Sequence, residues 1–164
     1  MKIIRIALGD LRHETVGAHS TYTPVGIGYM ATYLQSQLSC ETIEIRLFTK
    51  PDEILDCVDS WSPHVLGLSH YMWNASLSYQ VCEYAKQKDE QILSILGGPE
   101  FPSGSGQSSL ASSKDLCFDY LLERPAVDYY CYSDGETALV SVIEHYIECE
   151  HNVRLMKDSA ISVD

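Results

Sequence analysis

With 164 residues, 45% of them hydrophobic and 21% charged, the chain is long enough for one globular domain with a sizeable core. Its net charge of −12, from 11 basic and 23 acidic residues, argues against nucleic acid as a partner, because binding would require neutralising phosphates. No apolar run reaches the roughly 18–20 residues that cross a bilayer, so no membrane partner is expected. Residues 1–10 lack a small-residue cleavage site, which makes the cytoplasm the expected location.

The predicted elements of the first half alternate between strand and helix. Strand 3–9 comes first. A helix is then expected with Thr23 as N-cap and Pro24 at its first position, residue types that favour helix starts. Strand 42–48 and a short helix over 51–60 follow.

The second half continues the alternation. Its expected elements are strand 64–70, a helix capped by Asn74, strand 92–96, a short helix over 115–122, strand 128–132 and a helix over 134–149. The Ser/Gly-rich segment 102–114 is interpreted as a loop or insertion, and the tail 151–164 shows no clear period. This pattern predicts an α/β fold, a doubly wound sheet of about five parallel strands in the order 2-1-3-4-5.

The six cysteines contain no CxxC or CxxxCxxC motif: they are Cys40, Cys57, Cys82, Cys117, Cys131 and Cys149. Their spacing excludes a local zinc knuckle or a compact iron–sulfur motif. We expect reduced thiols that pack as small hydrophobic side chains.

Ligands of doubly wound sheets bind at the carboxyl ends of the strands, so four loops are the candidate site. The loop 69–74 (SHYMWN) carries aromatic side chains that either pack under neighbouring loops or form a flat wall for a large planar ligand. The loop 97–101 (GGPEF) is either a tight turn or a place where a ligand lies against the backbone. The loop 133–137 (SDGET) either caps a helix or admits a polar ligand group.

The first loop, 9–22, contains neither GxGxxG nor GxxxxGK[ST], which argues against dinucleotide or P-loop nucleotide binding. A response-regulator receiver is also disfavoured, because the third strand ends in Ser69 rather than Asp. His13 lies in this loop, where a lone histidine is more often solvent-exposed than a ligand.

Four stretches, taken in order, resemble the N-terminal cobalamin-binding domain of cobalamin-dependent radical SAM proteins. They are YTPVGIGYMATYL, SPHVLGLSHYMWNASLSY, ILSILGGPEFP and VDYYCYSDGETALVSVI. The family typically has a GGPE-like turn and a later GEGE-like turn. Here Ser133 replaces the first Gly of the later turn.

The resemblance implies a flavodoxin-like, Rossmann-like domain over 1–150 that holds cobalamin over its strand ends. The segment 151–164 is then a tail or linker toward a radical SAM domain absent from these residues. That downstream domain would carry a [4Fe–4S] cluster and S-adenosylmethionine and perform methyl transfer or related radical chemistry. The present segment would be non-catalytic by itself, with no catalytic residues of its own.

The residues expected to bind cobalamin come from the four loops: Ser69, His70, Tyr71, Trp73, Asn74, Gly97, Gly98, Pro99, Glu100, Ser133, Asp134, Gly135, Glu136, Thr137, His13 and Thr15. Related methionine-synthase-type domains ligate cobalt through the histidine of DxHxxG. In this sequence Asp10 and His13 are one residue further apart than in that motif. Because a ligand must place its nitrogen about 2 Å from the metal, we expect no histidine–cobalt bond, with His13 and His70 as the remaining candidates.

A second interpretation is a cofactor-free, degenerate domain that acts as a protein-interaction module. The acidic composition, the altered turn at Ser133 and the Ser/Gly-rich segment 102–114 fit that interpretation. A flavodoxin-like FMN protein fits less well, because no Ser/Thr–Gly phosphate loop follows the first strand.

Overall fold

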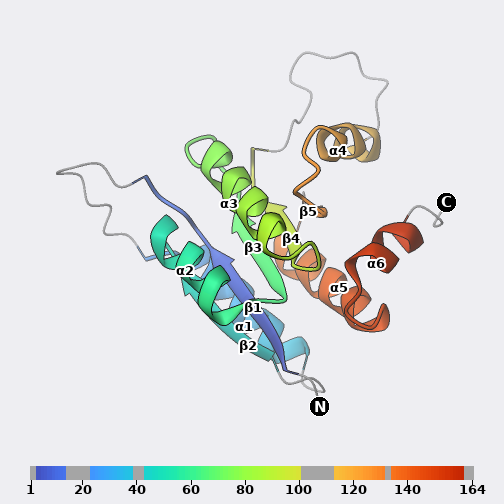
Figure 1. Ribbon diagram of the computed structural model, residues 1–164, viewed down its shortest axis with the longest axis horizontal. Coiled ribbons are helices and arrows are strands. Elements are labelled where there is room, and N and C mark those ends of the chain that lie inside the picture. Colours follow the sequence, from blue (N-terminus) through green and yellow to red (C-terminus); the bar gives the residue numbers. More distant parts are fainter. Residues whose placement is uncertain (1–2, 14–22, 39–42, 101–112, 132–133, 161–164) are drawn as a thin grey trace.

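A computed structural model describes residues 3–13, 23–38, 43–100, 113–131 and 134–160 (Figure 1). These residues form a parallel sheet in the order β2-β1-β3-β4-β5, which confirms the expected doubly wound, Rossmann-like fold. The strands are β1 (Ile4–Gly9), β2 (Ile43–Phe48), β3 (Val65–Ser69), β4 (Leu93–Gly97) and β5 (Tyr129–Cys131). The helices are α1 (Val25–Gln37), α2 (Pro51–Trp61), α3 (Ala75–Lys88), α4 (Ser113–Leu122), α5 (Gly135–Glu148) and α6 (Val153–Ala160).

Helices cover both faces of the sheet, with α2 and α3 on one face and α1 on the other (Figure 1). The first core lies under α1 and α5 and includes the fully buried Leu34 and Ile143. The second lies under α2, α3 and α4 and includes Ile54 and Val81. Burial on both faces explains why the central strands are continuously apolar rather than alternating. No helix in the described segments is long and apolar enough to cross a membrane.

The strand order reverses between β1 and β3, and this reversal positions the site. At the carboxyl end of β1, Gly9 pairs with Phe48 of β2 on one side and with Leu68 of β3 on the other. Ser69, the last residue of β3, pairs with Gly97 of β4. Because the connections from β1 and β3 leave toward opposite faces, a crevice opens above these strand ends.

Two helix starts differ slightly from the sequence-based expectation. The N-cap of α1 is Pro24 rather than Thr23, and no side chain makes a capping hydrogen bond there. Helix α4 begins at Ser113, two residues before the expected start at 115. Helix ends commonly vary by one or two residues because their terminal turns lack a full set of intrahelical hydrogen bonds.

The tail expected over 151–164 contains a helix, α6, that the sequence pattern did not reveal. Asn152 caps it by accepting a hydrogen bond from the Leu155 N–H at 3.0 Å. Val153 and Met156 are buried in the first core, and only these two positions of the described part of α6 are apolar and buried. The Nζ of Lys157 lies 2.5 Å from the buried carboxylate of Asp128, so α6 is also held by an ion pair.

Candidate functional site

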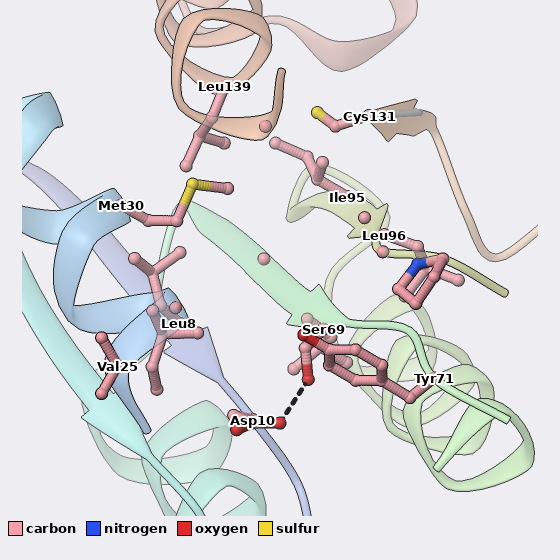
Figure 2. A pocket seen from close by; sticks show the side chains of 18 of the residues that line it. Leu8, Asp10, Val25, Met30, Ser69, Tyr71, Ile95, Leu96, Cys131 and Leu139 are labelled. Carbon is pink, nitrogen blue, oxygen red and sulfur yellow. Dashed lines mark hydrogen bonds between the residues drawn. The ribbon is translucent and has the colours of Figure 1, made fainter. Parts of the chain in front are cut away.

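A cavity of about 1090 Å³ lies above the carboxyl ends of β1, β3 and β4, between the amino-terminal parts of α1 and α5. Figure 2 shows Leu8 and Met30 on one side of it, Ile95 and Leu139 on another, and the Tyr71 ring at its edge. The lining consists of Leu8, Asp10, Arg12, His13, Thr23, Val25, Gly26, Ile27, Met30, Gly67, Leu68, Ser69, Tyr71, Trp73, Ile95, Leu96, Gly97, Gly98, Pro99, Cys131, Gly135, Glu136 and Leu139.

The walls are mainly aliphatic, and many of their residues come from elements rather than loops. Leu8 and Ile95 are strand residues, and Ile27 and Leu139 belong to the facing helices α1 and α5. Sequence reasoning treated such positions as core only, because a buried core side chain and an apolar pocket wall have the same periodicity. They differ from core residues only in facing the cavity, which their spacing in the sequence does not show.

Two stacked aromatic rings form one edge of the cavity. Tyr71 and Trp73 lie with ring centroids 4.5 Å apart and planes 6° from parallel, and Trp73 is 55% exposed. The loop that carries them is fixed by the fully buried Asn74, whose Oδ1 accepts a hydrogen bond from the Tyr71 N–H at 2.8 Å. The Asn74 side chain therefore supports the loop instead of capping α3 or lining the cavity.

The cavity has a polar corner at the end of β1. The Ser69 hydroxyl donates a 2.7 Å hydrogen bond to the carboxylate of Asp10, which is 7% exposed (Figure 2). The Asn74 Nδ2 donates to the Ser69 Oγ at 3.2 Å, so the hydroxyl is held from both sides. Arg12 and His13 line the cavity next to this corner. The corner can accept hydrogen bonds from polar substituents of a ligand or donate hydrogen bonds to them.

The turn after β4 lies directly against the backbone of the loop after β3. The His70 N–H donates to the Gly97 carbonyl at 2.8 Å, and the Glu100 N–H donates to the His70 carbonyl at 3.2 Å. Gly98 has φ +146°, and a Cβ there would lie 2.4 Å from the His70 carbonyl oxygen. Only glycine fits this position, and the close approach is to the protein's own backbone. Gly97, Gly98 and Pro99 line the cavity, whereas Glu100 does not.

The His70 side chain does not line the cavity. His70 is 3% exposed, and its ring lies edge-on to Tyr120 and Tyr130 of the second core. Burial, with a smaller contribution from the positive charge of Arg124, lowers the pKa of His70 from 6.5 to about 4. The side-chain alternation of an extended chain accounts for this placement, because Ser69 and Tyr71 point to the opposite side.

The turn before α5 contributes two of its expected residues to the cavity lining, Gly135 and Glu136. Asp134 is the N-cap residue of α5, and its carbonyl accepts a hydrogen bond from the Thr137 hydroxyl at 3.2 Å; neither residue lines the cavity. Ser133 and Thr15 lie outside the described residues. The described residues contain no group of three or more His, Cys, Asp or Glu side chains arranged to hold a metal ion.

Comparison with known proteins gives concordant results. A 96-residue segment is 29% identical to 2-(S-pantetheinyl)-carbapenam-3-carboxylate methyltransferase of Streptantibioticus cattleyicolor, covering 56% of this chain and 12% of that protein. A 76-residue segment is 29% identical to the cobalamin-dependent radical SAM methyltransferase TokK of Streptomyces tokunonensis, covering 46% of this chain and 9% of that protein. The aligned segments thus span about a tenth of these relatives' lengths.

A cobalamin-binding protein from Desulfitobacterium hafniense has a similar fold, with a TM-score of 0.57 and 15% identity over 87% of this chain and 58% of that one. The family model of the B12 binding domain matches residues 15–108, more than half of the chain. That range includes α1 and every element from β2 to β4. The chain therefore belongs to the B12-binding domain family.

Proposed function

We propose that this chain binds cobalamin in the cavity above β1, β3 and β4, as the cofactor-holding module of a larger cobalamin-dependent radical SAM methyltransferase. The observation that carries the proposal is the position of the cavity. It lies at the strand reversal of a B12-binding family sheet, where doubly wound folds bind their ligands.

The residues present fit a large ring with apolar faces. At about 1090 Å³ the cavity exceeds the roughly 300–1,000 Å³ typical of pockets for drug-sized ligands. Its aliphatic walls and the Tyr71–Trp73 pair offer flat, apolar contact, while Asp10 and Ser69 offer a few placed polar groups. When bound, cobalamin supplies a cobalt centre that carries a methyl group.

Each part of the lining has a proposed role in holding the ring. Tyr71 and Trp73 form a wall, and the turn Gly97–Pro99 supports one edge through its backbone. Gly135, at the start of α5, lets polar substituents of the ring approach the helix, and Glu136 lines the cavity beside it, whereas Thr137 does not line the cavity. His13, which lines the cavity, is assigned to its polar rim, while the expected role of Thr15 stays a prediction from the sequence. None of these residues is proposed to be catalytic.

We further propose that no histidine of this chain ligates cobalt. Both nitrogens of the His70 ring face tyrosine hydroxyls in the second core, on the far side of the loop from the cavity. His13 lines the cavity and is the candidate to test. The absorbance spectrum of cobalamin bound to His13→Ala should match that of the unaltered protein, and loss of a nitrogen-ligated signature would contradict the proposal.

The radical chemistry belongs, in this proposal, to a covalently linked downstream domain that holds a [4Fe–4S] cluster and S-adenosylmethionine. Its support is the name of TokK, which describes that relative as a cobalamin-dependent radical SAM methyltransferase. The sequence of the gene beyond residue 164 tests this part: a CxxxCxxC motif there would support it.

Titration with hydroxocobalamin tests the binding function. The chain contains two tryptophans, Trp73 at the cavity and Trp61 at the end of α2, away from the lining. We expect Trp73→Ala to weaken binding roughly tenfold, because an aromatic side chain contributes about 1–2 kcal/mol to such contacts. Trp61→Ala is the matched control and should bind normally. Failure of the unaltered protein to form a coloured complex at micromolar concentration would favour a cofactor-free interaction module.

A further inference from the structure

His70 lies between two tyrosine hydroxyls directly beneath the turn that follows β4. Its Nδ1 is 3.1 Å from the Tyr130 Oη, and its Nε2 is 3.1 Å from the Tyr120 Oη. The Tyr130 hydroxyl in turn donates to the Gly98 carbonyl at 3.0 Å. A chain of three hydrogen bonds thus runs from α4, through His70, to a turn that lines the cavity.

The direction of each hydrogen bond in this chain follows from the Gly98 carbonyl, the group at one end of it. A carbonyl can only accept, so the single hydroxyl proton of Tyr130 is used on Gly98. Tyr130 must then accept from His70, which places the ring proton on Nδ1. The Nε2 of a neutral ring with that tautomer is an acceptor, and it receives the hydroxyl proton of Tyr120. The low pKa of His70, about 4, keeps the ring neutral near pH 7.

The main chain of His70 holds the same turn from the other side. Its N–H and carbonyl bond to Gly97 and Glu100, and its carbonyl oxygen occupies the space in which a Gly98 side chain would lie. None of these three contacts involves the Gly98 carbonyl. The Tyr130 hydroxyl fixes that carbonyl.

We propose that His70 is a positioning residue for the ligand: its Nδ1–H tautomer commits Tyr130 as a donor to Gly98 and so sets the orientation of the turn Gly97–Pro99 against the bound ring. The inference rests on the proposed function for its ligand, but the tautomer itself is a property of the protein alone. The same histidine that the sequence suggested as a direct contact thereby acts through another side chain.

Two phenylalanine variants separate this role from simple core packing. Tyr130→Phe and Tyr120→Phe each delete one buried hydroxyl bonded to His70, but only Tyr130 is bonded to the turn. We expect Tyr130→Phe to weaken hydroxocobalamin binding roughly tenfold and Tyr120→Phe to weaken it less than twofold, while both lower the melting temperature. If the two variants lose affinity equally, or if neither does, the positioning role is refuted.

The imidazole ¹⁵N shifts of the cofactor-free protein test the tautomer independently. We expect a protonated Nδ1 and an unprotonated Nε2 for His70 at pH 7. The opposite tautomer would overturn the hydrogen-bond chain and leave the proposed function untouched. Failure of the unaltered protein to bind hydroxocobalamin would overturn the proposed function, and with it the role of His70 toward that ligand, whatever the tautomer. His70→Asn, whose amide can place a donor near the Nδ1 position, should retain more affinity than His70→Leu.

Discussion

Replacing Gly98 with alanine should disrupt the turn after β4 far more than the same change one residue earlier. The Gly98 backbone has φ +146°, a region almost restricted to glycine, and the next residue is Pro99, which further restricts the conformation. A Cβ would lie 2.4, 3.0 and 3.1 Å from the carbonyl oxygen, carbonyl carbon and nitrogen of His70. Because these are backbone atoms at the end of β3, no side-chain rotation can relieve the contact.

The loss of stability caused by Gly98→Ala can be calculated from the backbone strain and from the hydrogen bonds that the displaced turn would lose. Backbone strain of this kind costs about 1–3 kcal/mol. Movement of the turn also breaks the Tyr130–Gly98 and Glu100–His70 hydrogen bonds, at about 1 kcal/mol each. The lower entropy of an alanine-containing unfolded chain offsets about 0.4–1 kcal/mol. The free energy of unfolding should therefore fall by roughly 2–5 kcal/mol.

Urea denaturation followed by circular dichroism measures this difference, with Gly97→Ala as the matched control. A Cβ on Gly97 would meet the Cys131 Cβ and carbonyl oxygen at 3.3 Å, a contact that a small adjustment relieves. For slopes of about 1–3 kcal/mol per molar urea, Gly98→Ala should lower the midpoint by about 1 M or more and Gly97→Ala by much less. Equal midpoints for the two variants would refute the reasoning.

Three further outcomes concern stability. Because burial lowers the pKa of His70 from 6.5 to about 4, the unfolded chain takes up the proton first as the pH falls below 6.5. Between pH 6.5 and pH 4, the free energy of unfolding of the unaltered protein should thus fall by about 3 kcal/mol more than that of His70→Asn, as measured by urea titration. An equal fall for the two proteins would contradict this. Asp128→Asn leaves Lys86 and Lys157 without their shared carboxylate and should lower the free energy of unfolding by about 3 kcal/mol. Lys157→Met should lower it less, because the Lys157 side chain is 44% exposed. Equal urea midpoints for the two variants would argue against a structural ion cluster. Met156→Ala should lower the free energy of unfolding by roughly 2–5 kcal/mol in the same assay, and no change would mean that α6 does not pack against the first core.

The positions of the strands and the faces of the helices could be predicted because each depends on a repeated local signal, and the strand order followed from the usual topology of alternating strands and helices. Apolar runs bounded by turn residues place β1, β3 and β4, and the helical spacing of Ile27, Leu34 and Leu38 places the buried face of α1. Helix α6 escaped the same reasoning because its eight residues make only about two turns, which is too short for the spacing of Val153 and Met156 to repeat along the sequence. The capping residue Asn152 was the available signal.

The candidate site could be predicted only as far as its loops. The rule that ligands bind at the strand reversal directs attention to Ser69, Tyr71, Gly97 and Gly135, all of which line the cavity. The rule cannot predict which side chains of these loops point into a core instead of the cavity. His70 points into the second core because the hydroxyls of Tyr120 and Tyr130, distant in the sequence, are its hydrogen-bond partners there. Contacts between residues 50 or more positions apart leave no mark on local sequence.

The docked position of α6 has a practical consequence for experiments on this protein. Lys157 meets Asp128, the residue just before β5, so α6 contacts the sheet at the end opposite the cavity. Arg154 is exposed on that helix and does not line the cavity. A fluorescent probe attached at position 154 would report the release of α6 while leaving the mouth of the cavity unobstructed. A shortened or transplanted version of the domain should keep residues 153–160, since excision at residue 150 would open the first core to water and leave the Asp128 carboxylate with one cation instead of two.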